Sequence, residues 1–327
     1  MRIRLIVLLT ALALFVAPGQ AAKKNYTYVR VGNTPDGAGS PAPGTVLMGG
    51  GTDVDAAFQW MCERAGGGDF LVLRAAGTDA YNPYVDGLCP AANSVATLIV
   101  PGAAGANDPF VVAAIRNAEA IWIAGGDQSD YVMNWTGTAL QRELNTKVAS
   151  VPVGGTSAGM MVLTQYIYSA LLSQGVTSSQ ALADPFNKYI TLARDLFIVG
   201  DLARTIGDSH FVTRDRMGRT LAFMCRLAQS EPAPAPRAIA VDEETAVLID
   251  GSVTVVGTGA AYFLEAPGPA ESCQPKTPLT YANVDVYRLS GGGTFDLGAW
   301  RGRGGAQYQV SATAGVLSST QQGGAIY

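Results

Sequence analysis

Five short apolar runs, separated by segments with helical spacing, constrain the fold of this chain more than any other feature. The runs cover residues 45–49, 69–74, 94–100, 120–124 and 151–153, and the helical segments between them include 53–65, 108–117 and 131–149. Continuous apolar strands that alternate with helices predict a parallel sheet with both faces covered. Right-handed crossovers then give a doubly wound open sheet. We therefore predict an α/β fold, mostly parallel, with helices on both faces.

The pattern loosens after about residue 170, and strands become more frequent toward the C-terminus. We predict a helix over 214–227 and strands over 238–242, 246–249, 252–264 and 284–289, which would add an edge or a small β extension. The proline-rich run 230–236 is typical of a stiff surface insertion. Residues 23–44 are polar and rich in Gly, Pro and Asn, which indicates an irregular lead-in. Residues 45–327 are then a single α/β domain with a C-terminal β extension.

The first 22 residues have the features of a secretion signal. Arg2 and Arg4 precede an apolar run over 5–16, and Ala21 or Ala22 ends a small-residue cleavage site. The alternative, an uncleaved anchor, is disfavoured because the apolar run is too short to span a bilayer. The sequence therefore predicts a secreted or periplasmic protein with no membrane partner after cleavage.

Four cysteines and one histidine limit the choice between disulfides and metal. An even cysteine count in an exported chain indicates disulfides, and four cysteines allow three pairings. The most local pairing, Cys62–Cys89 with Cys225–Cys273, is favoured. No C-x-x-C spacing is present, so zinc is disfavoured, and we expect neither a metal nor a cofactor. The formal charge of −4 argues against nucleic acid as a partner.

The run 151–160 contains a candidate nucleophile. Val151–Val153 reads as a buried strand, a helix is predicted from Ser157 to about Ala170, and Gly155-x-Ser157-x-Gly159 lies between them. This pattern is typical of a nucleophile elbow, where a serine sits on a tight turn at a helix N-terminus. The N–H of Ala158 would help to bind an oxyanion. In an open parallel sheet this turn shares one rim with the loops 49–51, 77–78 and 125–128.

A serine nucleophile needs a base and an acid that orients it. His210 is the single histidine, and the next acids outside the arginine-rich segment and the proline-rich insertion are Asp242, Glu243 and Glu244. The order Ser–His–acid argues against an α/β-hydrolase, in which the acid precedes the histidine. Three arginines at the start of the predicted helix 214–227 are unfavourable to the helix dipole, which indicates that they bind an anion such as a substrate carboxylate: Arg214, Arg216 and Arg219.

Four motifs in this order resemble those of the cyanophycinases, serine peptidases related to aspartyl dipeptidase (dipeptidase E). The motifs are Gly125-Gly126-Asp127-Gln128, Gly155-Thr156-Ser157-Ala158-Gly159, Asp208-x-His210-Phe211-x-x-Arg214-x-Arg216-x-x-Arg219 and Val241-Asp242-Glu243-x-Thr245-Ala246. The resemblance implies a fold like that of class I glutamine amidotransferases.

The same resemblance implies roles for individual residues. Ser157 would be the nucleophile, His210 the base and Glu243 the orienting acid, and the N–H groups of Gly126 and Ala158 would form the oxyanion hole. The substrate pocket would be lined by Gln128, Asp208, Ser209, Arg214, Arg216 and Arg219. The family usually has Gln where this chain has Ser209, and the proline-rich insertion is also a departure.

The activity implied is hydrolysis of cyanophycin or of β-aspartyl or Asp-rich peptides. Two alternatives stay open: a dipeptidase- or amidase-like activity on another small peptide, and a non-catalytic secreted binding protein on the same scaffold. A homodimer is also left open.

Overall fold

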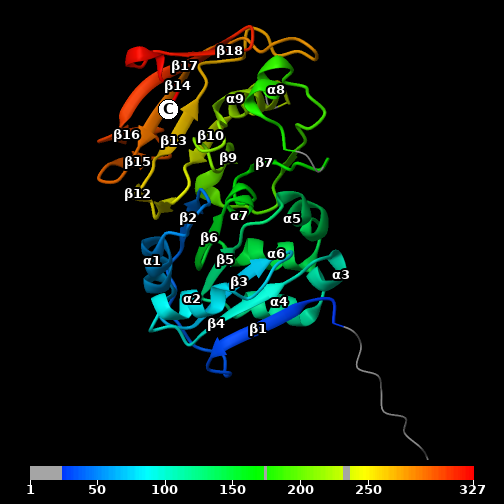
Figure 1. Cartoon of the computed structure of the whole chain (residues 1–327). Coiled ribbons are helices and arrows are strands. Elements are labelled where there is room, and N and C mark those ends of the chain that lie inside the picture. The colour runs from blue at the N-terminus through cyan, green and yellow to red at the C-terminus, as the bar shows by residue number, and fades with distance from the viewer. Residues whose placement is uncertain (1–23, 173–174, 231–235) are drawn as a thin grey trace, which may run out of the picture.

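The computed structural model describes residues 24–172, 175–230 and 236–327, and these build two sheets (Figure 1). The predicted signal peptide and most of the proline-rich run lie outside the described residues. The mixed α/β architecture is confirmed. The first sheet contains the predicted parallel strands, and the second carries much of the C-terminal half of the chain.

The first sheet has ten strands in the order β1-β4-β3-β5-β6-β2-β11-β12-β15-β16. The parallel strands β4, β3, β5, β6 and β2 form its centre, and antiparallel strands flank them on both sides. The strand bounds are β1 Thr27–Gly32, β2 Gly44–Met48, β3 Asp69–Arg74, β4 Ser94–Ile99, β5 Ala120–Ile123, β6 Pro152–Thr156, β11 Thr245–Ile249, β12 Val253–Gly257, β15 Thr294–Asp296 and β16 Arg301–Arg303.

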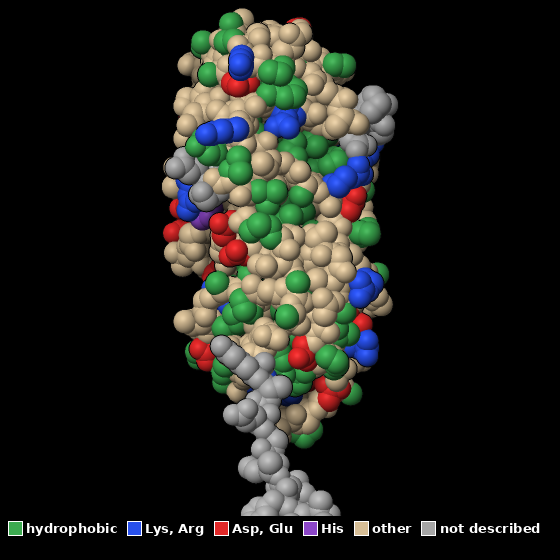
Figure 2. All heavy atoms as spheres, turned by 90° about the vertical axis from the view of Figure 1, so that its right-hand side faces the viewer, with side chains coloured by type: hydrophobic (Ala, Val, Ile, Leu, Met, Phe, Trp, Pro, Cys, Tyr) green, Lys and Arg blue, Asp and Glu red, His purple; other side chains and the backbone are tan. Residues whose placement is uncertain are grey.

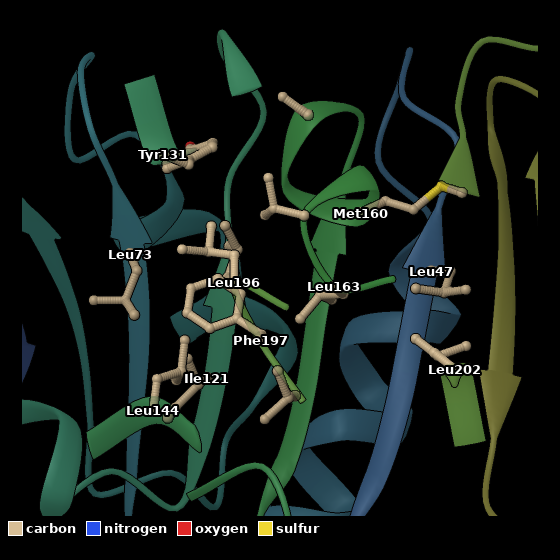
Figure 3. Packing of buried hydrophobic residues seen from close by; sticks show 14 of the residues in the cluster. Leu47, Leu73, Ile121, Tyr131, Leu144, Met160, Leu163, Leu196, Phe197 and Leu202 are labelled. Carbon is tan, nitrogen blue, oxygen red and sulfur yellow. The ribbon is translucent and has the colours of Figure 1, made fainter. Parts of the chain in front are cut away.

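Two layers of helices bury the two faces of the parallel strands. Side chains of α1 and α2 pack with Val46, Val72 and Trp122 on one face. Those of α4, α5 and α6 pack with the alternate side chains, such as Leu73 and Ile121, on the other; Figure 3 shows part of this second cluster. The helices are α1 Asp55–Ala65, α2 Tyr81–Leu88, α3 Ala103–Ala106, α4 Pro109–Arg116, α5 Gln128–Trp135 and α6 Ala139–Lys147.

The second sheet has eight strands in the order β18-β17-β14-β13-β10-β9-β7-β8. It is a separate layer rather than the small extension of one sheet that the sequence predicts. Helix α9 (Met217–Ser230) contributes to its core cluster. The other elements are β7 Tyr166–Tyr168, β8 Leu192–Arg194, β9 Thr205–Asp208, β10 Arg237–Val241, β13 Ala261–Glu265, β14 Tyr281–Leu289, β17 Ala306–Thr313, β18 Val316–Ser319, α7 Ala158–Met161, α8 Ser178–Ala183, and the short 3-10 helices Gly200–Leu202 and Gln322–Gly324.

Several local predictions are wrong. The helix predicted over 131–149 is divided into α5 and α6, and the strand predicted over 252–264 is divided into β12 in the first sheet and β13 in the second. The lead-in contains β1, because the pairing of Thr27–Gly32 with β4 outweighs the surrounding Gly, Pro and Asn. The helix predicted from Ser157 to Ala170 is only α7, followed by β7; nearly every residue there is buried, so the sequence has no periodicity to separate helix from strand. The helix predicted from Arg214 begins at Met217.

Both disulfides of the favoured local pairing are present. Cys62 on α1 is joined to Cys89 at the end of α2, and Cys225 on α9 is joined to Cys273. The loops that they close span 27 and 48 residues. Cross-links of this kind typically stabilise a fold by about 2–4 kcal/mol each. Within the described residues, no helix is both long enough and apolar enough to cross a membrane.

The glycines of the turn after β6 are required by close packing, which gives a stability prediction. A Cβ on Gly159 would lie 2.0 Å from the carbonyl oxygen of Ile123. We expect Gly159→Ala to lower the free energy of unfolding by at least about 2 kcal/mol. Gly87, on α2, has nothing within 4 Å of the same position. Gly87→Ala should be neutral or stabilising by up to about 1 kcal/mol. Urea unfolding of both variants tests this, and equal stabilities would contradict it.

Candidate active site

Ser157 occupies a strained turn between β6 and α7. Its φ of 54° and ψ of −117° lie outside the usual regions for a residue with a side chain. The turn is held because the N–H of Ser157 donates to the carbonyl of Met48 on the neighbouring strand β2, at 3.0 Å. A Cβ on Gly155 would meet the backbone of Gly159 at 2.5 Å, so a side chain at Gly155 would not fit. This is the geometry expected of a nucleophile elbow.

His210 and Glu243 complete a chain of hydrogen bonds that starts at Ser157. The Oγ of Ser157 lies 2.8 Å from Nε2 of His210, and Nδ1 of His210 lies 2.5 Å from Oε1 of Glu243. With Glu243 ionised, the proton sits on Nδ1 and Nε2 is free to accept the serine proton. The side chain of His210 is 8% exposed; in Figure 2 a part of the single histidine (purple) is visible beside acidic and basic side chains.

The pKa values of these groups suit a base and its partner. Burial lowers the pKa of His210, while its hydrogen bond to Glu243 acts in the opposite direction. The hydrogen bond from His210 lowers the pKa of Glu243. The imidazole is therefore neutral and the carboxylate ionised near neutral pH, as general-base chemistry requires.

Gly49–Gly51, which directly follow β2, contact His210 and the segment around Glu243. The carbonyl of Gly49 accepts the N–H of His210 at 2.7 Å, and the carbonyl of Gly50 accepts the N–H of Glu244 at 2.8 Å. Gly50 has a φ of +99°, and a Cβ on it would lie 2.3 Å from the imidazole Cε1. Any side chain at Gly50 would displace the ring. The sequence predicts these glycines on the rim, but their contact with the histidine has no local signal.

The loop after β5 lies beside Ser157. A Cβ on Gly125 would be 3.5 Å from the Cβ of Ser157. Gly126 follows in the same exposed loop, and Gln128 begins α5 with its side chain half-buried. Ala158 is the first residue of α7. The backbone N–H groups of Gly126 and Ala158 are therefore on segments next to the hydroxyl, as an oxyanion site requires.

Asp208 and Arg219 do not line an open pocket, which corrects the sequence prediction. They are 1% and 4% exposed. Arg219 binds both carboxylate oxygens of Asp208, with Nε to Oδ2 at 2.8 Å and Nη2 to Oδ1 at 2.5 Å. Arg216 contacts Oδ1 at 3.2 Å and Thr220 donates to Oδ2 at 3.0 Å. Arg216 and Arg219 therefore bind the carboxylate of Asp208, a group of the protein itself.

This cluster also sets the charge of Asp208. Burial alone would raise the pKa of Asp208, but the charges of Arg219 and Arg216 outweigh it and lower the pKa. Burial lowers the pKa of Arg216 to about 10. Neither group changes charge near neutral pH, so the cluster is a fixed structural element.

Ser209 is also buried rather than pocket-lining. It is 1% exposed, and its Oγ contacts the sulfur of Met161 at 3.5 Å. Its carbonyl accepts a hydrogen bond from Arg216 at 2.6 Å. Of the three predicted arginines, Arg214 alone is exposed, and its charge lowers the pKa of both His210 and Glu243.

Tyr327 contacts the segment that carries His210, a contact that sequence analysis does not predict. Its hydroxyl accepts the N–H of Met217 at 2.9 Å and donates to Asp215 at 2.8 Å. Its ring packs edge-on against Phe211, with centroids 5.5 Å apart. This contact joins residues far apart in the chain, so no local pattern can predict it. Among the residues that the structure describes, no cluster of three or more His, Cys, Asp or Glu could hold a metal.

The buried cluster around Asp208 predicts a loss of stability rather than of substrate affinity. In Asp208→Asn, Arg219 would keep its charge without an anion, and we expect the free energy of unfolding to fall by about 3 kcal/mol. Asp86→Asn makes the same change at an exposed position on α2 and should have little effect. Urea unfolding measures both. If Asp208→Asn is as stable as the wild type but has a raised KM, Asp208 binds substrate and the structural role is wrong.

Comparisons with known proteins can be set against this geometry. The model of Peptidase family S51 matches residues 104–187, which include the turn at Ser157. Several solved structures are similar to this one, and two of them serve as examples. One is a peptidase from an acI-B1 Actinobacterium, with a TM-score of 0.53 and 15% identity, covering 79% of this chain and 98% of its own.

The other is a putative peptidase E protein from Listeria monocytogenes EGD-e, with a TM-score of 0.43 and 13% identity, covering 66% of this chain and 99% of its own. No curated protein matches the sequence. The similarity to the actinobacterial structure concerns the fold alone. The family match covers the segment that carries Ser157, and it confirms the predicted resemblance to the dipeptidase E-like serine peptidases of family S51.

Proposed function

We propose that this protein is a secreted or periplasmic serine peptidase that hydrolyses cyanophycin or β-aspartyl or Asp-rich peptides. The hydrogen-bonded chain from Ser157 through His210 to Glu243 carries the proposal. Two disulfides support a location outside the cytoplasm. For the fold, we propose the class I glutamine-amidotransferase-like arrangement, supported by parallel strands with helices on both faces.

In the proposed mechanism, Ser157 forms an acyl-enzyme with the substrate. Nε2 of His210 takes the proton from Oγ while Oγ attacks the carbonyl carbon. The N–H groups of Gly126 and Ala158 stabilise the oxyanion. The C–N bond then breaks and His210 gives the proton to the departing amine. A water molecule, activated by the same nitrogen, attacks the ester and releases the acid, while Glu243 stays ionised and orients the ring.

Arg214 is the best-supported contact for a substrate carboxylate. It is exposed near the base, whereas Arg216 and Arg219 are engaged by Asp208. Gln128 can supply an amide contact from the loop beside Ser157. A hydrolase acting on another small acidic peptide fits these contacts equally well. A panel of cyanophycin, β-aspartyl dipeptides and uncharged dipeptides separates these substrate classes.

Removing the Ser157 hydroxyl should abolish the chemistry without unfolding the protein. We expect Ser157→Ala to lower kcat at least about 10³-fold, because Ser157 supplies the hydroxyl that lies against Nε2 of His210. A fluorophosphonate probe should label the wild type but not this variant. Ser252→Ala, at an exposed turn, should keep both activity and labelling. A folded wild type that resists the probe favours a binding protein, and full activity of Ser157→Ala excludes the proposed mechanism.

The dependence of kcat/KM on pH should show the lowered pKa of His210. The base works when neutral, and its pKa is lowered from 6.5, so activity is lost only as the pH falls through a value below 6.5. Glu243→Gln should lower kcat about 10³–10⁴-fold, because a neutral amide does not stabilise the imidazolium. Glu63→Gln, an exposed position on α1, is the control. An acid limb above pH 6.5 in the wild type would contradict the assignment.

A further inference from the structure

A cavity at the rim of the first sheet has no part in the mechanism above. Its volume is about 390 Å³, and its walls come from the loop after β2, the end of β3 and the start of α2. Thr52, Asp53 and Asp55 lie on the first side, Arg74 on the second, and Tyr81 and Tyr84 on the third. The size is that of a site for a small molecule or for one or two residues of a peptide.

The cavity carries separated charges of opposite sign. Asp53 and Arg74 both line it, yet no ion pair joins them within the described part of the chain. Arg74 is held in place by the loop that follows it, with Nε donating to the carbonyl of Ala76 at 2.6 Å and Nη1 to that of Thr78 at 2.8 Å. The guanidinium is thus fixed as a cation on one wall.

The acidic wall is equally well defined. The hydroxyl of Tyr84 donates to Asp55 at 2.6 Å. Burial raises the pKa of Asp53, and a hydrogen bond from Tyr81 partly offsets this. The rings of Tyr81 and Tyr84, with centroids 6.3 Å apart, provide apolar surface between the charged groups. A ligand that carries one cation and one carboxylate, joined by a short apolar stem, matches these walls.

The cavity lies near the triad, because one of its lining residues contacts the residue that follows Glu243. The hydroxyl of Thr52 donates to Glu244 at 3.3 Å, and a Cβ on Gly51 would lie 3.0 Å from the Cβ of Glu243. Strand β3, which ends at Arg74, is separated from β6 only by β5. Neighbouring strands are about 4.8 Å apart, so the ends of β3 and β6 are separated by about 10 Å. About three residues of an extended peptide span that distance.

We propose that this cavity is a substrate subsite that binds a zwitterionic terminal residue of a short peptide, with its cation at Asp53 and its carboxylate at Arg74. The inference rests on the proposed peptidase function, since it places the rest of the peptide at Ser157. It also assigns recognition to loops that contain none of the sequence motifs described above.

Binding can be measured without turnover by using the Ser157→Ala variant. The probe is 6-aminohexanoate, which has one ammonium and one carboxylate on an apolar stem; hexylamine and hexanoate each carry one of these charges. Calorimetry should show binding of the zwitterion at least about tenfold tighter than of either comparator, since one charged hydrogen bond contributes about 1.5–3 kcal/mol. Equal affinities, or no binding of the zwitterion, would overturn the proposal.

A matched pair of substitutions localises the effect. Adding Asp53→Asn to Ser157→Ala should weaken 6-aminohexanoate at least about tenfold and leave hexanoate unchanged. Adding Asp86→Asn, an exposed position on α2 outside the cavity, should change neither affinity. The unfolding midpoint of each variant shows whether the cavity is intact. Undiminished binding in a folded Asp53→Asn variant contradicts the assignment.

Inhibition of the wild type separates this inference from the proposed function. If both hold, 6-aminohexanoate raises KM for a hydrolysed peptide without changing kcat. If Ser157 is catalytic but the zwitterion does not compete, the subsite is wrong and the peptidase stands. If the zwitterion binds through Asp53 but no peptide is hydrolysed, the cavity is a ligand site and the peptidase proposal fails.

Discussion

The contact between Gly50 and His210 is the constraint on which the candidate site depends. Ser157 follows β6 in the first sheet, His210 follows β9 in the second, and Glu243 lies where the chain passes from β10 to β11. The three side chains therefore meet only if the two sheets approach closely. A glycine at the end of β2 permits this, because a Cβ there would overlap the imidazole. The carbonyls of Gly49 and Gly50 then fix the two segments from the second sheet.

The ion cluster around Asp208 has a related structural role. Arg216 reaches both Asp208, at the end of β9, and the carbonyl of Ser209. Arg219 anchors the first turns of α9 to the same carboxylate. His210 has a positive φ of 47°. The turn that carries it is therefore fixed by the contacts of Arg216 and Arg219 with the residues that precede it, Asp208 and Ser209. Buried ion pairs contribute little net stability but strongly disfavour arrangements that separate them. We infer that the cluster restricts the imidazole to one position.

The sequence predicts the parallel core and Ser157 from local signals, whereas the choice of Glu243 among three neighbouring acids depends on the resemblance to a family. Apolar strands alternate with helices, and Ser157 lies in a recognisable turn. The second sheet was underestimated because its first strand, β7, is part of a run buried on all sides. The pocket was mispredicted for a different reason: charged side chains in a motif do not reveal which of them pair with one another. Asp208 and its arginines neutralise each other, and only the structure shows this.

The division of the triad between two sheets explains why the C-terminal half is not a mere extension. The first sheet alone carries the strained serine and the candidate oxyanion-binding N–H groups, but not the histidine. The second sheet supplies the histidine and, through β10, the acid. His210 and Glu243 contact Gly49–Gly51, which have no side chains that could move to compensate for a shift between the sheets. A small shift would therefore lengthen the distance from Oγ of Ser157 to Nε2 of His210. General-base catalysis requires that distance to stay near hydrogen-bond length. The packing between the sheets is therefore part of the geometry of the candidate site, and Gly50, which follows β2, lies where His210 comes closest to the first sheet.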